Sequence, residues 1–88
     1  MKIKPQYKVH HVADEDIVLV QGRNPGDLTT VIALNSTSLF LWNSLAGRQF
    51  ELPDVVDLLV RRFEVSTDRA SADAQQWIYQ LRQSNILE

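Results

Sequence analysis

The sequence predicts an α+β fold in which a three-stranded antiparallel sheet comes first and three helices follow. Short apolar runs separated by turn residues fill residues 1–34, and apolar residues recur at helical spacing after that point. The change falls at Asn35. A third strand followed only by helices is the last strand of its sheet, so we expect one of its edges to be free for pairing.

The three expected strands differ in their patterns. Residues 7–12 alternate, with Tyr7, Val9 and His11 on one side, which is typical of a strand with one face on the core. Residues 17–20 are continuously apolar, which indicates either a strand covered on both faces or the central strand of three. The third strand is expected over residues 29–34, near the common strand length.

Two connections join these strands. Residues 13–15 are expected to form a turn, and residues 21–29 a hairpin loop. Within this loop, proline presets one backbone angle and glycine is free to take positive φ, so turn chemistry is carried by Asn24, Pro25, Gly26 and Asp27.

Each expected helix has a start signal. The side chain of Asn35 can accept from the amides of the first turn of a helix over residues 37–46, and Gly47 provides its stop. Pro53 suits the opening turn of a second helix that ends near Phe63. The residues of the first helix expected to face the core are Leu39, Trp42 and Leu45 or Ala46.

Ser66 or Thr67 is expected to cap the start of the third helix, and Asn85 is expected to be its C-cap. After the cap, Ile86 and Leu87 are expected to fold back on the core. One apolar stripe of this helix consists of Ala70, Ala74, Trp77, Ile78 and Leu81. Both tryptophans lie on apolar stripes; we expect Trp42 in the core and Trp77 partly exposed at a groove.

Composition narrows the class of protein. The 88 residues suit a single domain, 1–88, with no deep enclosed pocket, and the absence of cysteine excludes disulfides and thiolate metal sites. A net charge of −2 argues against electrostatic binding to nucleic acid. We find neither a signal peptide nor an apolar run of membrane-spanning length, so we expect a soluble, cytoplasmic protein.

No group of residues predicts catalysis, a metal or a cofactor. His10 and His11 are adjacent in a strand and point to opposite faces, so they cannot share a metal without a bulge. The acidic run Asp14, Glu15 and Asp16 has the composition of a solvated turn. We therefore expect a protein that is not an enzyme.

A winged-helix DNA-binding regulator is the alternative function, with the third helix in a DNA groove. The exposed positions of that helix include Asp68 and Asp73, and its exposed cations are Arg69 and Arg82, so phosphate contacts would be few. This charge balance disfavours the alternative.

Three segments together resemble the PqqD family, named for a pyrroloquinoline quinone biosynthesis protein. They are IALNSTSLFLWNSLAG, FELPDVVDLLVRRFEV and ADAQQWIYQLRQSNIL. The resemblance implies a small winged helix-turn-helix-like domain that acts without catalysis as a recognition element for ribosomally made precursor peptides. A leader peptide would add as a strand to the edge of the third strand and pack against the third helix.

Carried onto this sequence, the resemblance implies that the peptide meets Thr30, Val31, Ile32, Ala33, Leu34, Asp73, Trp77, Ile78, Leu81 and Arg82. It also suggests a radical S-adenosylmethionine enzyme, or another peptide-modifying enzyme, as partner. The loop QGRNPGDLT is longer than the quinone-pathway pattern leads us to expect, which indicates a branch of the family that serves another product. A homodimer through the third-strand edge is a further alternative.

Overall fold

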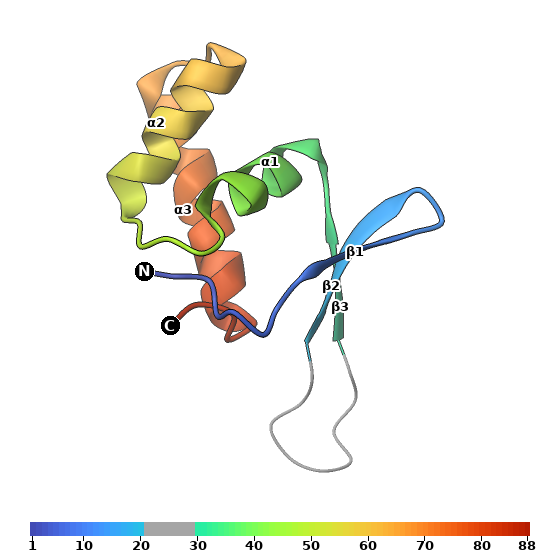
Figure 1. Ribbon diagram of the computed structural model, residues 1–88. Coiled ribbons are helices and arrows are strands. Elements are labelled where there is room, and N and C mark those ends of the chain that lie inside the picture. The colour runs from blue at the N-terminus through green and yellow to red at the C-terminus, as the bar shows by residue number, and fades with distance from the viewer. Residues whose placement is uncertain (21–29) are drawn as a thin grey trace.

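The computed structural model describes residues 1–20 and 30–88 and confirms the predicted order of three antiparallel strands and three helices (Figure 1). The strands are β1 (Val9–Val12), β2 (Glu15–Val20) and β3 (Thr30–Leu34). The helices are α1 (Ser36–Leu45), α2 (Leu52–Phe63) and α3 (Thr67–Gln83). The sheet order is β1-β2-β3. The turn expected at Asn24, Pro25, Gly26 and Asp27 lies outside the described residues.

The first hairpin is tighter than the sequence pattern indicated. Val12 pairs with Glu15, so the turn consists of Ala13 and Asp14 alone, with φ values of 49° and 66°. Positive φ at both turn residues suits a two-residue hairpin, because its twist matches that of the strands. The prediction of a turn over residues 13–15 was therefore wrong at its C-terminal end, and β2 begins two residues before the predicted position.

The start of β1 also differs from the prediction. The Tyr7 backbone N–H donates to the Lys4 carbonyl oxygen at 3.1 Å, which closes a turn around Pro5. Since this turn uses the backbone up to residue 7, regular pairing begins only at Val9, where β1 meets Val18 of β2.

One face of the sheet is buried and the other is exposed. The paired residues Val18 and Ile32 point toward the helices and are buried, whereas the neighbouring pair Leu19 and Val31 points away and is exposed. β2 is the central strand, as one of the two interpretations predicted. The other interpretation, cover on both faces, was wrong because Leu19 is 43% exposed.

Asn35 joins β3 to α1 and caps the helix as predicted. Its side-chain oxygen accepts from the Ser38 backbone N–H at 2.8 Å. The apolar stripe differs from the expected one, because the buried residues of α1 are Leu41, Trp42 and Leu45. Leu39 is only half-buried, since the face that α1 turns toward the core is centred between Leu41 and Leu45.

Replacing Asn35 with alanine is expected to lower the free energy of unfolding by about 1 kcal/mol, because one amide of the first helical turn loses its acceptor. Urea unfolding followed by circular dichroism measures the change. Asn43→Ala, at an exposed position of the same helix, is the matched control and should leave stability unchanged or slightly raised. An equal loss for both variants would contradict a role for the cap.

Local hydrogen bonds cap the starts of the two longer helices. Pro53 lies in the first turn of α2, as predicted, and the Asp54 carboxylate accepts from the Glu51 backbone N–H at 2.8 Å. The Ser66 side chain accepts from the Arg69 backbone N–H at 3.2 Å, which confirms Ser66 as the cap of α3. These contacts set where α2 and α3 start.

At the end of α3, the cap is Ser84 rather than the predicted Asn85. Asn85 is the next residue and takes the left-handed conformation, with φ of 58°. The backbone N–H of Ile86 then donates to the Leu81 carbonyl oxygen at 3.0 Å, and that of Asn85 to Arg82 at 3.0 Å, the pair of bonds that closes a Schellman motif. This turn directs Ile86 and Leu87 back into the core, as predicted.

The core lies between the buried face of the sheet and the three helices. Trp42 is 3% exposed, which confirms the prediction for this residue. Trp77 is 5% exposed, so the prediction of partial exposure was wrong. The indole of Trp77 packs against Phe50, with ring centroids 6.1 Å apart, and Phe50 belongs to the segment between α1 and α2.

Candidate functional site

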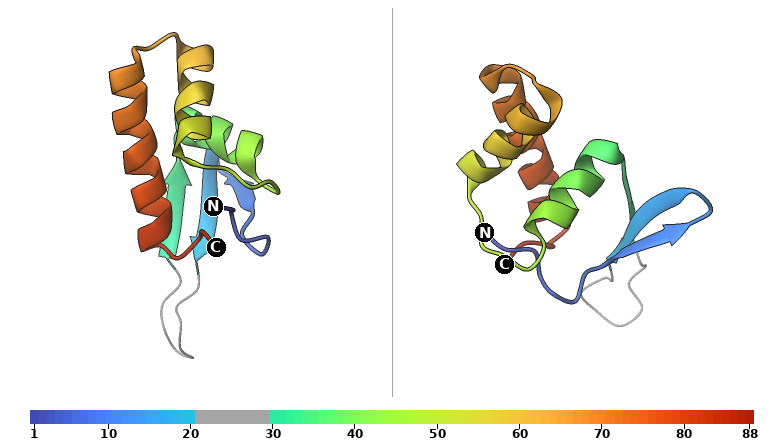
Figure 2. Two further views of the ribbon diagram at one scale, coloured as in Figure 1. Left: turned by 90° about the vertical axis from the view of Figure 1, so that its left-hand side faces the viewer. Right: turned by 45° about the horizontal axis from the view of Figure 1, so that its top comes forward.

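The free edge of β3 is the first component of the site. β3 pairs with β2 on one side, and no strand among the described residues pairs along its other side. The helices lie on one side of the sheet (Figure 1), and in the turned view α3 runs along the β3 side rather than the β1 side (Figure 2, left). An added strand at β3 would therefore lie beside α3.

Side chains of β3 alternate between two environments. Ile32 is buried against the helices and Leu34 is half-buried on the same face. Val31 is 56% exposed and shares the outer face with Ala33. The strand is thus held by its buried face, which leaves the unpaired backbone groups of its edge available.

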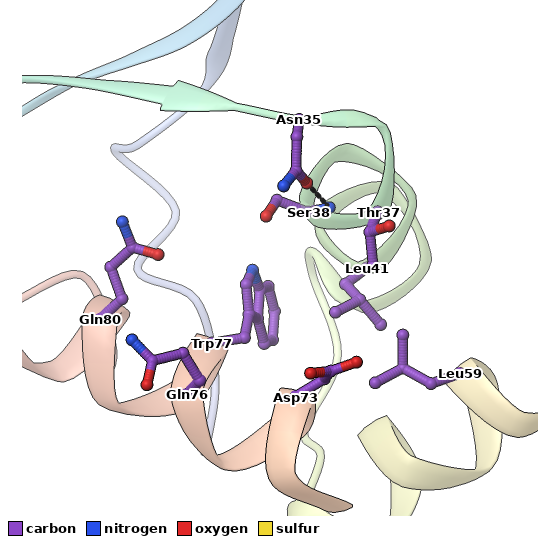
Figure 3. A pocket seen from close by; sticks show the side chains of 9 residues that line it. All are labelled: Asn35, Thr37, Ser38, Leu41, Leu59, Asp73, Gln76, Trp77 and Gln80. Carbon is purple, nitrogen blue, oxygen red and sulfur yellow. Dashed lines mark hydrogen bonds between the residues drawn. The ribbon is translucent and has the colours of Figure 1, made fainter. Parts of the chain in front are cut away.

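A hollow of about 280 Å³ lies where β3 ends, between the start of α1 and α3 (Figure 3). We call it the junction hollow. Most of its lining side chains are polar, and Leu41 and Leu59 supply its apolar wall. The lining residues are Asn35, Thr37, Ser38, Leu41, Leu59, Asp73, Gln76, Trp77 and Gln80.

Two polar features define the chemistry of the junction hollow. The indole Nε1 of Trp77 is buried and has no hydrogen-bond partner among the described residues. Asp73 is the ionisable residue of the lining, and its carboxylate lies 3.9 Å from Nε of Arg69 in an exposed pair one turn away. Exposed pairs of this kind are worth little, so the Asp73 carboxylate remains available to a ligand.

The structure groups only some of the predicted site residues together. Asp73 and Trp77 line the junction hollow, and β3 runs directly into it through Asn35. Ile78 and Arg82 line a separate hollow of about 270 Å³, together with Met1, Leu52, Gln75 and Tyr79. Leu81 is 1% exposed and belongs to the core.

Helical geometry explains this separation. Residues three or four positions apart share a helix face, which places Asp73, Gln76, Trp77 and Gln80 in one row along α3. Ile78 and Arg82 form a neighbouring row that faces the N-terminal segment, where Arg82 Nη2 lies 3.4 Å from the sulfur of Met1. Counting three or four residues at a time from Asp73 along the sequence would have identified Gln76 and Gln80 as further residues of this row.

Nothing in the described part of the chain assembles a metal site. His11 Nδ1 lies 3.1 Å from an oxygen of Asp16, and the His11 side chain is 66% exposed. Across residues 1–20 and 30–88, no three His, Cys, Asp or Glu side chains are grouped so that they could hold a metal ion. Over the same ranges, no helix has the length and apolarity needed to cross a membrane.

Comparison with known proteins places the chain in a family. Residues 12–87 match the family described as coenzyme PQQ synthesis protein D (PqqD). Among solved structures, TbiB1 in complex with the TbiA(beta) leader peptide is similar, with a TM-score of 0.72 and 20% sequence identity. The match covers 100% of this chain and 95% of TbiB1, and at this identity it shows a shared fold. No curated protein matches the chain significantly. Because the family match spans most of the sequence, this chain belongs to the PqqD family.

Proposed function

We propose that this protein binds the leader segment of a ribosomally made precursor peptide, without catalysis, by adding it as a strand to β3. The observation that carries the proposal is the unpaired β3 edge on the side of the sheet along which α3 runs (Figure 2). Membership in the PqqD family supports it, as does the shared fold with a protein solved together with a leader peptide.

Strand addition supplies affinity and selectivity through different groups. The main chain of the added strand would pair with the outward-facing N–H and C=O groups of Thr30–Leu34. Alternate side chains of the peptide would then turn toward α3 and the junction hollow. Asp73 and Trp77 are the α3 residues that we assign to this contact.

Ile78, Leu81 and Arg82 take supporting roles in this proposal. Leu81 holds α3 against the core, and Ile78 and Arg82 hold the neighbouring row of the helix against the N-terminal segment. Their substitution should change stability more than peptide selectivity.

The bound leader would be presented to a peptide-modifying enzyme in the cytoplasm, for which a radical S-adenosylmethionine enzyme is our first candidate. The outer face of the sheet, which carries Leu19 and Val31, stays uncovered when a strand adds to the edge. The enzyme could therefore approach from that face without displacing the peptide.

A binding titration tests the proposal against its alternatives. Fluorescently labelled peptides from the N-terminal part of candidate precursors should bind with a dissociation constant in the micromolar range or below, because ordering the peptide consumes part of the interaction energy. A labelled DNA duplex, titrated at rising salt, is the control. Strong DNA binding that weakens steeply with salt, without peptide binding, would contradict the proposal and favour a regulator.

Sedimentation velocity at two protein concentrations tests whether a second copy occupies the same edge. We expect a monomer that keeps β3 free. A dimer that dissociates on addition of peptide would show that the peptide and the second copy compete for β3.

A further inference from the structure

We infer that the junction hollow recognises a neutral carbonyl oxygen of the bound peptide through the indole N–H of Trp77. This inference rests on the proposed function and adds the kind of chemical group on the peptide that the hollow would bind. Apolar pockets alone would favour aliphatic side chains, whereas the lining of this hollow favours a hydrogen-bond acceptor.

The first observation is the unpaired donor. Trp77 is 5% exposed, and its Nε1 has no hydrogen-bond partner among the described residues. Buried polar groups are nearly always paired, and each exception requires an explanation. Figure 3 shows the nitrogen end of the indole directed toward Asn35 and Ser38, inside the hollow. Because the nitrogen itself exposes less than 1 Å², a ligand acceptor would pair this N–H once a neighbouring side chain moves aside.

The second observation is the orientation of Asn35. Its side-chain oxygen accepts from the Ser38 backbone N–H at 2.8 Å. Since a backbone N–H can only donate, this bond assigns the oxygen and leaves the Asn35 NH₂ group as a donor. The amide nitrogen of Asn35 turns into the hollow (Figure 3). Two donors thus face the same space.

Charge decides which acceptor suits these donors. Asp73 is the ionisable residue among those that line the hollow, so its fixed charge is negative. A ligand carboxylate would be repelled by Asp73, whereas a neutral carbonyl oxygen would not. The carbonyl belongs either to an Asn or Gln side chain of the peptide or to its main chain, and the experiment distinguishes these two sources.

A random peptide library displayed on phage and selected against the whole protein tests the inference without a known precursor. If the carbonyl comes from a side chain, recovered peptides should carry Asn or Gln at one aligned position. If it comes from the main chain, no such position appears, but replacing one backbone amide of the peptide by an ester should weaken binding. Enrichment of Asp or Glu, or of Leu and Ile, at the position that enters the hollow would overturn the inference.

Two variants assign the effect to the donors. Trp77→Phe keeps an aromatic ring and removes the N–H, and should weaken binding of the selected peptides by about threefold to tenfold. Asn35→Asp keeps the helix cap and removes the NH₂ group, and should weaken it as well. The Asn-to-Leu or ester change in the peptide should then cost little further affinity in Trp77→Phe. Full sensitivity of that variant to the peptide change would contradict the inference.

The indole signals provide a direct readout. On binding, the N–H proton of Trp77 should move downfield in the nuclear magnetic resonance spectrum, because it gains an acceptor, while the Trp42 signal serves as the internal reference. Peptides that bind at β3 and leave the Trp77 signal unmoved overturn this inference alone. Failure to recover any peptide that binds at β3 contradicts the proposed function itself, so the two failures are distinguishable.

Discussion

Replacing Trp77 with alanine is expected to lower the free energy of unfolding by about 3 to 5 kcal/mol. The side chain is 5% exposed and packs against Phe50, so its removal leaves a cavity between α3 and the segment before α2. A chain of 88 residues has a total stability of roughly 4 to 13 kcal/mol. The loss therefore removes a large share of the total, and urea unfolding at neutral pH measures it.

Tyr79→Ala is the matched control for this experiment. Tyr79 lies two residues further along α3 and is 60% exposed, so its removal should change stability by less than about 1 kcal/mol. A similar loss for the two variants would contradict the packing described for Trp77.

Two proline substitutions in β3 are expected to separate folding from peptide binding. In an edge strand, adjacent residues direct their N–H groups alternately to the neighbouring strand and to the free edge. Thr30 and Val31 are adjacent exposed positions of β3. When proline replaces each of them in turn, one variant loses a hydrogen bond to β2, whereas the other loses only an N–H that faces the free edge. The second variant should fold with nearly normal stability and bind peptide at least about tenfold more weakly.

Each of the two proline variants serves as the control for the other. Circular dichroism and urea unfolding identify the variant that keeps the β2–β3 pairing, and fluorescence anisotropy then gives its affinity for the peptide. Normal affinity in a well-folded variant whose outward N–H is missing would contradict strand addition at β3.

Those parts of the fold that depend on local chemistry could be predicted from the sequence. Asn35, Pro53 and Ser66 act within one helical turn, and the structure confirms all three. The errors lie where a boundary depends on backbone geometry. Ala13 adopts positive φ, which its residue type does not indicate, and the Schellman motif places Asn85 one position beyond the cap of α3.

The candidate site could be predicted only in part, because it depends on contacts between distant segments. The resemblance to the PqqD family implied Asp73 and Trp77 as site residues, and both line the junction hollow. The burial of Trp77 follows from Phe50, which lies in no periodic segment. The division of the predicted α3 residues between two hollows follows from where the N-terminal segment lies, which no local pattern indicates.

Amide hydrogen exchange of β3, with and without a bound leader peptide, tests the central claim most directly. The free protein should exchange quickly at every second backbone N–H of Thr30–Leu34, because those groups face the open edge. Peptide binding should protect these same groups, while β1, at the other edge of the sheet, remains unchanged. Protection gained at β1, or peptide binding that leaves the outward amides of β3 exchanging as before, would contradict strand addition at this edge.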